Sequence, residues 1–307
     1  MTIADHVTPV RHVPVLLKEV LDSLNLSKGK FIVDGTIDGG GHAREIIKVI
    51  MPGGSFLGID LDIDLLDKIK ESFLNEFSRS KCDIRVEWAN YKDINYVLEQ
   101  NHLGKPDGIL LDLGFSSYHI EDSQRGFSFQ KEEILDMRYD TTSGISATEA
   151  INSMDEGALA DMIWRFGEER FSRQIAKAIV QARRKKRIET TIQLVEIIGN
   201  AVPAFYRKGR INPATKTFQA LRIYVNEELK NLAEFLEKVP GIIAEGGRVA
   251  IISFHSLEDR MVKVAFANFK KEGIAKLITK KPIIATREEV SNNPRSRSAK
   301  LRVIEFI

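Results

Sequence analysis

The sequence is nearly free of cysteine and lacks long apolar runs. Cys82 is the single cysteine among 307 residues, which excludes an internal disulfide framework and any metal site built from several cysteines. No stretch approaches the roughly 18 uncharged apolar residues of a membrane-spanning helix, and the first thirty residues lack a basic start followed by an apolar segment. We therefore expect a cytoplasmic protein, and we assign no metal ligands.

A strong net charge is also absent, but the charges are unevenly distributed. The formal net charge is +2. Residues 160–222 contain 14 Lys or Arg and 5 Asp or Glu, a local charge of +9 that leaves −7 for the rest of the chain. A basic segment within an acidic remainder indicates a surface for a polyanion such as nucleic acid. A solvated helical surface is the alternative.

Strand and helix patterns alternate over the first 112 residues. An amphipathic helix is expected at Val15–Leu24, where apolar residues recur at helical spacing. The alternation that follows is typical of βαβ units, which form a parallel sheet with its ligand site at the carboxyl ends of the strands. The expected strands are Lys30–Asp34, Ser55–Asp60, Ile84–Trp88 and Gly108–Asp112, with helices at His42–Ile50 and Asp64–Phe77.

After Gly126 the pattern is helical for nearly ninety residues, and then the strands resume. Capping-box spacings begin at Ser146 and Ser153. Later expected elements are helices at Glu168–Arg184, Thr191–Ala201 and Ala214–Lys238, a buried strand at Gly247–Phe254, and an antiparallel edge pair at Ile274–Thr286 and Ala299–Ile307 around the polar loop Glu288–Ser298. The sequence therefore predicts an α/β fold: a doubly wound, Rossmann-like sheet (residues 1–124 and 212–307) with an inserted all-helical domain (125–211).

A glycine-rich loop with two carboxylates follows the first expected strand. Glycines 39–41 allow a ligand to approach the backbone closely, as in nucleotide-binding loops. Asp34 and Asp38 would repel the pyrophosphate of a dinucleotide, whereas the sulfonium and ammonium groups of S-adenosylmethionine suit them. Asp60 ends the second strand, where a carboxylate can bind ribose hydroxyls. A purely structural turn with an ordinary aspartate at the strand end is the alternative.

The fourth strand ends in a carboxylate that suits transfer to an exocyclic amine. The lone pair of such an amine is delocalised into the ring, so an acceptor must localise it while the methyl group arrives in line. Asp112 offers that acceptor, and Phe115 could stack on a flipped base. Alternatively, Asp112 only binds cofactor and Phe115 belongs to the core. Carbon methylation of a pyrimidine generally needs a cysteine thiolate, and Cys82 lies away from this strand end.

Several motifs are long, ordered and unusual: His12–Leu17, Val33–Thr36, Gly40–His42, Asp112–Gly114 with Ser116–Ser117, Arg125–Phe129, Asp136–Arg138, Asn212–Gln219, Ser253–Arg260 and Ser296–Lys300. Together they strongly resemble, nearly end to end, the bacterial ribosomal RNA small subunit methyltransferase H family, which makes 4-methylcytidine in the decoding region. The resemblance implies a class I methyltransferase sheet and S-adenosylmethionine as the cofactor.

The resemblance also implies a set of cofactor contacts. They are Gly40, Gly41, His42 and Asp112, with Asp60 at the ribose and Tyr91 near the adenine. The family usually has phenylalanine at the position of Tyr91, glutamine at that of His119, and small residues at those of Phe115 and Asp38. His119 is kept as a candidate cofactor contact that departs from the family pattern.

Further residues are candidates for contact with the substrate. Asp112 is the expected acceptor of the amine hydrogen, and Ser253 and His255 are expected to help position the base, although His255 could instead tie its strand to the following helix. The candidate RNA contacts are Arg183, Arg184, Lys185, Lys186, Arg187, Lys216, Arg295 and Arg297. The cluster that closes a helix could instead serve the helix dipole. Trp88 and Trp164 are expected in the core rather than as base-stacking platforms, and they are given no role.

These observations predict S-adenosylmethionine-dependent N4-methylation of a cytidine in the decoding region of 16S rRNA. The substrate is free rRNA or the assembled 30S subunit, and a homodimer stays open. One alternative is an NAD-linked oxidoreductase on the same fold, which a titration with each cofactor would separate. The other is a non-catalytic RNA-binding protein with a vestigial site, which methyl transfer to small subunits would exclude.

Overall fold

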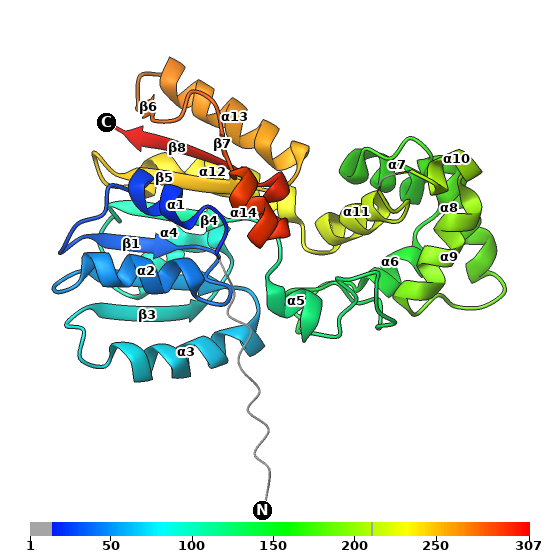
Figure 1. Cartoon of the computed structure of the whole chain (residues 1–307), viewed down its shortest axis with the longest axis horizontal. Helices are drawn as coiled ribbons and strands as arrows, with labels where there is room; N and C mark the ends of the chain where they lie inside the picture. The colour runs from blue at the N-terminus through cyan, green and yellow to red at the C-terminus, as the bar shows by residue number, and fades with distance from the viewer. Residues whose placement is uncertain (1–13, 210) are drawn as a thin grey trace, which may run out of the picture.

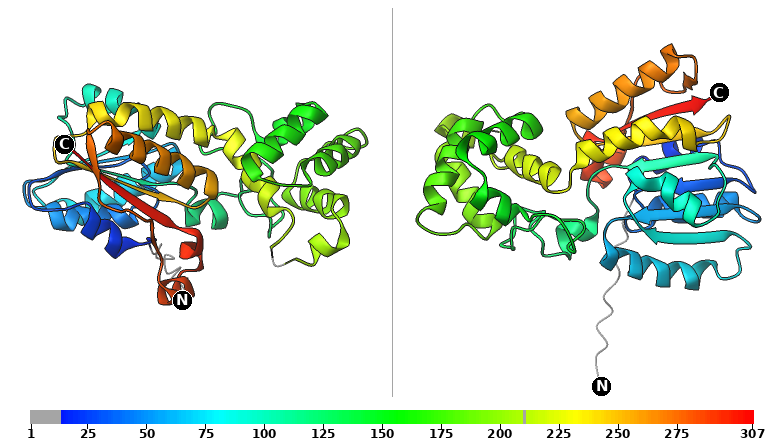
Figure 2. Two further views of the ribbon diagram at one scale, coloured as in Figure 1. Left: turned by 90° about the horizontal axis from the view of Figure 1, so that it is seen from above. Right: turned by 180° about the vertical axis from the view of Figure 1, so that it is seen from behind.

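An α/β sheet unit and a helical unit lie side by side in the molecule (Figure 1). The computed structural model describes residues 14–209 and 211–307. The chain leaves the sheet unit after strand β4 and returns to it along helices α11 and α12 (Figures 1 and 2). Both connections pass beside the same end of the sheet.

A mixed sheet forms the centre of the sheet unit. Within the described ranges its strand order is β3-β2-β1-β4-β5-β8-β6, and β7 also pairs with β8. Strands β1 to β5 pair in parallel, whereas β8 runs antiparallel to β5, β6 and β7. Because the order reverses between β1 and β4, a ligand site is expected at their carboxyl ends. The bounds are β1 Phe31–Asp34, β2 Ser55–Asp60, β3 Asp83–Trp88, β4 Gly108–Asp112, β5 Arg248–Ser253, β6 Ala275–Leu277, β7 Ile283–Ile284 and β8 Lys300–Phe306.

Apolar side chains cover both faces of this sheet. Ile32 and Leu110 pack with α1, α2 and α3, whereas their neighbours Val33 and Leu111 pack with α4, α12 and α13. Successive side chains of a strand point to opposite faces, so continuous apolar runs produce two cores. The helices are α1 Leu17–Ser23, α2 Gly41–Ile50, α3 Ile63–Phe77, α4 Ile94–Gln100 after the 3-10 turn η1 Tyr91–Asp93, α12 Glu228–Ile242, α13 Ser256–Lys271 and α14 Arg287–Asn292, followed by η2 Pro294–Ser298.

The helical unit has a core of its own. Helix α7 packs against α8 and α11, and apolar residues such as Ile163, Ile179 and Phe218 are buried between them. The bounds are α5 Ser117–Glu121, α6 Ala147–Ser153, α7 Glu156–Gly167, α8 Ser172–Arg183, α9 Thr191–Ala201, α10 Ala204–Arg207 and α11 Thr215–Val225. Because α11 contributes to this core, we propose that the helical unit ends after Val225 rather than at residue 211.

The predicted helix Ala214–Lys238 is wrong in one respect, because the structure divides it into α11 and α12. Glu227 has a left-handed backbone with φ of 50°. The Asn226 side chain donates to the carbonyl oxygen of Met137 at 2.8 Å and accepts from the backbone N–H of Tyr139 at 2.8 Å. Hydrogen bonds to the other connection thus fix the break, which propensity alone does not indicate.

Smaller corrections concern caps and edges. Glu168 is left-handed with φ of 49°, so α8 begins at Ser172 and not at Glu168. Asp155 caps α7 in place of Ser153, whereas the capping box at Ser146 is confirmed. The polar segment 288–298 is mostly helical, in α14 and η2. The final strand pair is antiparallel as predicted, but β8 lies inside the sheet and not at its edge.

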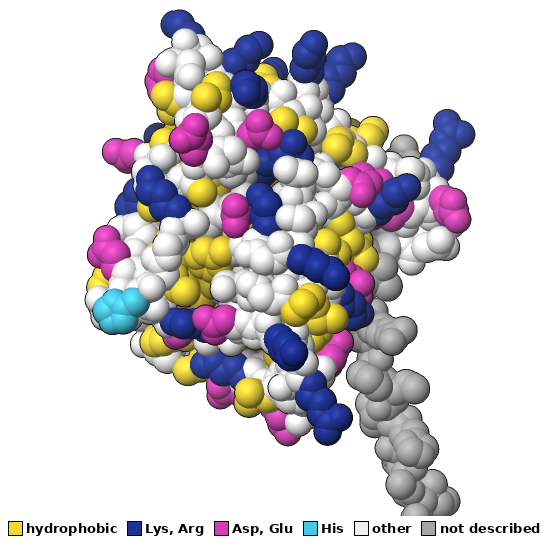
Figure 3. All heavy atoms as spheres, turned by 90° about the vertical axis from the view of Figure 1, so that its left-hand side faces the viewer, with side chains coloured by type: hydrophobic (Ala, Val, Ile, Leu, Met, Phe, Trp, Pro, Cys, Tyr) yellow, Lys and Arg dark blue, Asp and Glu magenta, His cyan; other side chains and the backbone are white. Residues whose placement is uncertain are grey.

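The outer surface of the sheet unit is mixed in charge. Figure 3 shows the face turned away from the helical unit, where Lys and Arg side chains are interspersed with Asp and Glu. Such a face offers no continuous basic surface to a polyanion. In the part of the chain that the structure describes, every helix is too short or too polar to cross a bilayer.

Candidate active site

Two cavities meet at the carboxyl ends of the strands. The first, the acidic cleft, lies beside β1, β2 and β4 and is lined by residues that include Gly35, Asp38, Asp60, Tyr91, His119 and Glu258. The second, the apolar cavity, has a volume of about 400 Å³ and is lined by residues that include Phe115, Phe127, Phe129, Phe218 and Phe254. Gly114 lines both. The two cavities are therefore neighbours at Gly114.

Buried carboxylates dominate the acidic cleft and the strand ends behind it. Burial raises the pKa of Asp34 to about 7, against a hydrogen bond from the Thr36 N–H and with the charge of Asp60 adding to the rise. Burial, and then the charge of Asp60, holds the pKa of Asp38 well above its usual range. The pKa of Asp112 is raised by burial and by the charge of Asp34. Carboxylates crowded in this way fit a positively charged ligand.

Asp112 lies behind the acidic cleft and lines neither cavity, and it is the least satisfied of these groups. Its Oδ1 is buried without a hydrogen-bond partner in the described part of the chain. Its Oδ2 lies 3.6 Å from Nδ1 of His42, whose Nε2 lies 2.9 Å from the carbonyl oxygen of Val15. A buried polar atom left without a partner is costly, so Oδ1 marks a place for a donor or a cation from a ligand.

The glycine loop turns the chain into α2 behind the cleft. Gly40 is left-handed with φ of 72°, and a Cβ atom there would lie 3.0 Å from the Phe73 ring. Gly40 and Gly41 open α2; neither they nor His42 belong to the lining of either cavity, where Gly35 and Thr36 stand instead. The predicted contacts at these three positions stay predictions.

Asp60 and Tyr91 lie in the lining, as the sequence predicts. The Asp60 carboxylate accepts the backbone N–H groups of Asp38 and Asp62, each at 3.0 Å. It therefore holds the glycine loop against the start of α3 and keeps free lone pairs on the cleft side. The Tyr91 ring packs edge-on against Phe235.

His119 lines the acidic cleft, but both of its ring nitrogens are engaged inside the protein. Nδ1 accepts from the backbone N–H of Ser116 at 3.1 Å, and Nε2 lies 3.0 Å from Oδ2 of Asp62. Asp62 also caps α3 and accepts from Arg125. Burial raises the pKa of Asp62, but the hydrogen bond from His119 and the charge of Arg125 outweigh it, so the net pKa is lowered. His119 can thus offer a ligand its ring rather than a hydrogen bond.

Phe115 belongs to the apolar cavity and not to the core. Its ring is 37% exposed, stacks on Phe127 with centroids 6.2 Å apart, and lies under the guanidinium of Arg222 at 4.7 Å. The interpretation of Phe115 as a core residue is therefore wrong. A partly exposed ring in the lining of the apolar cavity is suited to stack on a planar ligand.

Ser253 and His255 differ in their relation to the cavities. The Ser253 hydroxyl is 1% exposed, donates to the carbonyl oxygen of Lys300 at 3.4 Å and lines neither cavity. Its hydroxyl is thus engaged with β8, and its predicted role at the target base stays a prediction. His255 lines the apolar cavity and caps α13, with Nδ1 accepting from the Glu258 N–H at 3.3 Å. The alternative interpretation, that His255 ties its strand to the following helix, is confirmed.

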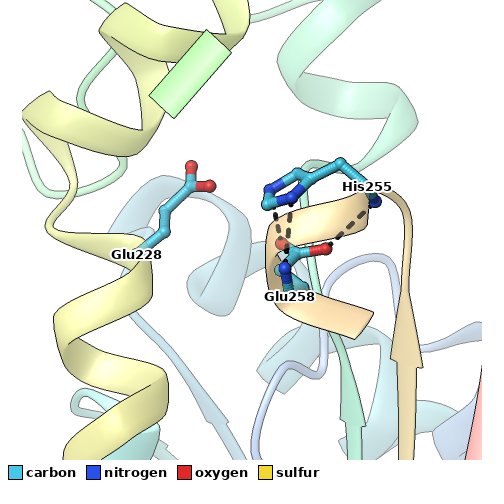
Figure 4. Close-up of side chains that lie close together, drawn as sticks. All are labelled: Glu228, His255 and Glu258. Carbon is cyan, nitrogen blue, oxygen red and sulfur yellow. Dashed lines mark hydrogen bonds and ion pairs between the residues drawn. The ribbon is translucent and has the colours of Figure 1, made fainter. Parts of the chain in front are cut away.

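Glu258 and Glu228 are site residues that the sequence interpretation missed (Figure 4). Glu258 Oε2 accepts the backbone N–H of Phe254 at 2.9 Å, and Oε1 lies 3.1 Å from Nε2 of His255, without the angle of a hydrogen bond. Burial raises the pKa of Glu258, but His255 outweighs it and the net pKa is lowered. The sequence contains a signal for Glu258, namely the capping-box spacing from His255 to Glu258. It contains no comparable signal for Glu228.

Potential ligand atoms of Glu228, His255 and Glu258 lie within 4.8 Å of one another. A divalent cation would compete there with Arg222, which already binds both carboxylate oxygens of Glu228 at 2.8 and 2.9 Å. One permanent positive charge inside the cluster makes a metal a poor fit, so we assign none.

Comparisons with known proteins show the family of this chain. The chain matches the MraW methylase family over residues 9–307. It belongs to that family. It is 47% identical over 294 residues to the ribosomal RNA small subunit methyltransferase H of Nostoc sp., covering 96% of this chain and 92% of the relative. The protein of that name from Persephonella marina is 45% identical over 298 residues, with 97% and 100% covered.

Family membership confirms the predicted resemblance and the methyltransferase sheet. Among solved structures, an rRNA methylase from Streptococcus thermophilus aligns with a TM-score of 0.43 at 9% identity, covering 95% of this chain and 92% of that chain. So distant a likeness adds nothing to the family assignment.

The basic candidates divide into exposed and engaged residues. Arg184, Lys185, Lys186 and Arg187 lie where α8 ends, and all four are exposed; we call residues 184–187 the basic loop. Arg183 instead donates to the carbonyl oxygens of α6 and the residue after it, Ile151 and Met154. It therefore joins α8 to α6, and its contact with RNA stays a prediction.

The other basic candidates lie nearer the site. Lys216 donates to the carbonyl oxygen of Glu168 at 2.8 Å, and Arg295 pairs with Glu121 at 2.7 Å while lining the apolar cavity. Arg297 is exposed. The assignment of the two tryptophans to the core is wrong, because Trp88 and Trp164 are 45% and 56% exposed.

Proposed function

We propose that this protein transfers a methyl group from S-adenosylmethionine to N4 of a cytidine in the decoding region of 16S ribosomal RNA. The observation that carries the proposal is the meeting of an acidic cleft and an aromatic cavity at Gly114. Membership of a methylase family and relatives named ribosomal RNA small subunit methyltransferase H support it. The first cavity suits a cationic donor, and the second suits a flat base taken out of its strand.

The residues of the cleft fit S-adenosylmethionine better than a dinucleotide. The buried carboxylates and the unpartnered Oδ1 of Asp112 favour a sulfonium and an ammonium, and they would repel a pyrophosphate. Asp60 would accept the ribose hydroxyls, and Tyr91 would hold the adenine. The backbone N–H groups of Gly40 and Gly41 at the start of α2 would suit the carboxylate of the amino acid part.

When bound, S-adenosylmethionine supplies a methyl group activated by a positively charged sulfur. The protein must align the base amine with it and accept a proton, because N4 gains a bond to carbon while the carbon–sulfur bond breaks and sulfur keeps the electron pair. Asp112 stands at the end of β4 as the proposed acceptor of that hydrogen. Phe115 would stack on the base, and His255 would act as a positioning residue through Glu258.

We propose that the rRNA is held by the basic loop together with Lys216, Arg295 and Arg297. Charged groups of this kind bind phosphates independently of sequence, so they would orient the RNA and leave the choice of base to the cavity. The partner would be small-subunit rRNA, free or in the 30S subunit. A homodimer remains a further hypothesis.

The direct test is methyl transfer from labelled S-adenosylmethionine to 30S subunits, and separately to naked 16S rRNA, from a strain that lacks the gene. We expect labelled N4-methylcytidine in a nuclease digest analysed by mass spectrometry. Label on another atom or in another nucleotide would refute the assigned target. An absence of transfer, together with tight binding of NAD in a calorimetric titration, would refute the whole proposal.

A further inference from the structure

Two charged pairs span the junction between the cavities, and both have the same orientation. Arg222 and His255 line the apolar cavity, whereas their partners Glu228 and Glu258 line the acidic cleft. The cationic or donor group of each pair thus lines the proposed base site, and the carboxylate lines the neighbouring acidic cleft. Both carboxylates are nearly buried, with side chains 11% and 3% exposed.

Three hydrogen bonds hold the Glu228 carboxylate. Its Oε1 accepts from Arg222 Nε at 2.8 Å and from the Tyr139 hydroxyl at 3.2 Å, and its Oε2 accepts from Arg222 at 2.9 Å. The side chain extends from α12 towards the His255 ring (Figure 4). A carboxylate can accept about four hydrogen bonds, so these three leave Oε2 able to accept one more.

The Arg222 guanidinium is also held in one orientation. Nε and one terminal nitrogen bind Glu228, and the guanidinium lies over the Phe115 ring at 4.7 Å. A guanidinium has five N–H groups, so donors remain on the side that lines the apolar cavity. Burial lowers the pKa of Arg222, but the charge of Glu228 outweighs it and the net pKa is raised. Arg222 therefore stays protonated and remains a hydrogen-bond donor.

An Arg–Glu pair at this place presents a donor beside an acceptor. Cytosine carries an acceptor, N3, next to a donor, the N4 amine, along its Watson–Crick edge; uracil carries the reverse, an N3–H donor and an O4 acceptor. The N3 acceptor and N4 donor of cytosine match the Arg222 donor and the Glu228 acceptor. With uracil, the N3–H group would face an Arg222 N–H, and O4 would face the Glu228 carboxylate. A buried carboxylate facing a carbonyl oxygen is especially unfavourable.

We infer that Glu228, held across the junction by Arg222 and Tyr139, is the specificity-determining residue of the base site and selects a base with an exocyclic amine beside an unprotonated ring nitrogen. The inference rests on the proposed function for the identity of the cavity. It adds that Glu228 disfavours a base that carries a carbonyl oxygen, such as O4 of uracil, in place of the exocyclic amine. Asp112 then serves the transfer itself, and Glu228 serves the choice of base.

The test measures base choice and not catalysis. Cytidine and uridine are titrated into the protein saturated with S-adenosylhomocysteine, with saturation-transfer NMR as the readout. We expect the wild-type protein to prefer cytidine roughly tenfold, the value of one good paired recognition. Glu228→Gln should bring the ratio close to one, because an amide can donate to O4 as readily as it accepts from N4. Glu228→Asp should lower the ratio while keeping the charge that balances Arg222.

The matched control is Glu227→Gln, a neighbouring carboxylate whose side chain is 55% exposed and pairs only with Lys230 among the described residues. It should leave the ratio unchanged. Affinity for S-adenosylhomocysteine and the thermal midpoint report whether each variant is folded, and the Asp variant carries the test if the Gln variant is not. An unchanged ratio in a folded Glu228 variant, or no nucleoside binding by the wild-type protein at millimolar concentration, overturns the inference.

The methyl-transfer assay separates this inference from the proposed function. Production of N4-methylcytidine with an unchanged ratio in the Glu228 variants would refute the inference alone. Preference for cytidine that depends on Glu228, without methyl transfer, would refute the function alone.

Discussion

The two cavities that meet at Gly114 are built from opposite chemistry. The acidic cleft is walled by backbone, carboxylates and their hydrogen bonds, and the pKa values of Asp38, Asp60 and, behind them, Asp112 are raised because these groups are buried close to other carboxylates. The apolar cavity is walled by five phenylalanines with a few donors among them. One is poised for positive charge, and the other for a flat neutral ring.

This contrast shows how one sheet edge can align two reactants. Electrostatic fit to the carboxylates favours the cationic donor in one cavity, and stacking on phenylalanine favours the flat base in the other, so neither ligand suits the other's place. Gly114 lines both cavities. The Arg222–Glu228 pair joins them, because Arg222 lines the apolar cavity and Glu228 lines the acidic cleft. Variants that damage one cavity only should therefore separate the two functions.

The largest expected effect is that of Asp112→Asn. An amide cannot accept the amine proton, so the rate of methyl transfer at saturating cofactor should fall roughly a thousandfold, within the range for loss of a general base. Single-turnover transfer of a labelled methyl group measures it. The control is Asp122→Asn, an exposed carboxylate after α5. A variant that still binds cofactor and keeps its rate would remove Asp112 from the chemistry.

The next effect concerns the cleft alone. Asp60→Asn should weaken S-adenosylmethionine binding roughly tenfold to a hundredfold, because the variant no longer offers charged hydrogen-bond acceptors and holds the glycine loop less firmly. Calorimetric titration gives the affinity, and Asp64→Asn on the exposed start of α3 is the control. Cytidine affinity in the apolar cavity should not change. Equal weakening of both ligands would show that the cavities are not separable.

A smaller effect is expected far from both cavities. Replacing the basic loop, residues 184–187, with alanine should weaken rRNA binding roughly tenfold and reduce the slope of log affinity against log salt by up to about 0.9 for each phosphate that the loop neutralises. Filter binding at several salt concentrations measures both. Lys270→Ala with Lys271→Ala, at the end of α13, is the control. An unaltered slope would assign the loop to solvent rather than to RNA.

The sequence predicts the cleft better than the cavity, and the reason is physical. Strand ends carry their side chains to one edge of a parallel sheet, so Asp60 and Asp112 can be located from the strand pattern alone. The phenylalanines of the apolar cavity follow β4, α5 and β5 or belong to α11, and no local spacing brings them together. Only the packing of α11 and the break at Glu227 does so.

The partners of single side chains cannot be predicted from the sequence for the same reason. The structure places the Ser253 side chain against β8 because β8 is inserted beside β5, a pairing that local pattern cannot specify. Arg183 is indistinguishable in sequence from the basic residues that follow it, yet its position inside α8 directs it to the carbonyl end of α6. Side-chain partners across long separations decide both cases.

The smallest expected effect is a dependence of cofactor affinity on pH. The groups concerned are the carboxyls at the cleft and the charged groups near them, Asp34, Asp38, Asp60, Asp62, Asp112, His42, His119, Arg125 and Glu258. The pKa of Asp34 is about 7 in the folded protein against 3.8 ordinarily. The ligand-free protein therefore binds extra protons between these values and loses stability as the pH rises from about 4 to 7.

A cationic ligand reverses this trend, since it favours the ionised carboxylates and must expel their protons. Affinity for S-adenosylmethionine should thus rise a few fold from pH 6 to pH 8, and titrations in buffers of different ionisation enthalpy should show proton release. S-adenosylhomocysteine lacks the sulfonium charge and should release fewer protons, and Asp34→Asn should release fewer with either ligand. Equal release by both ligands would mean that the cleft does not sense the sulfonium, and the contrast between the two cavities would then rest on shape rather than charge.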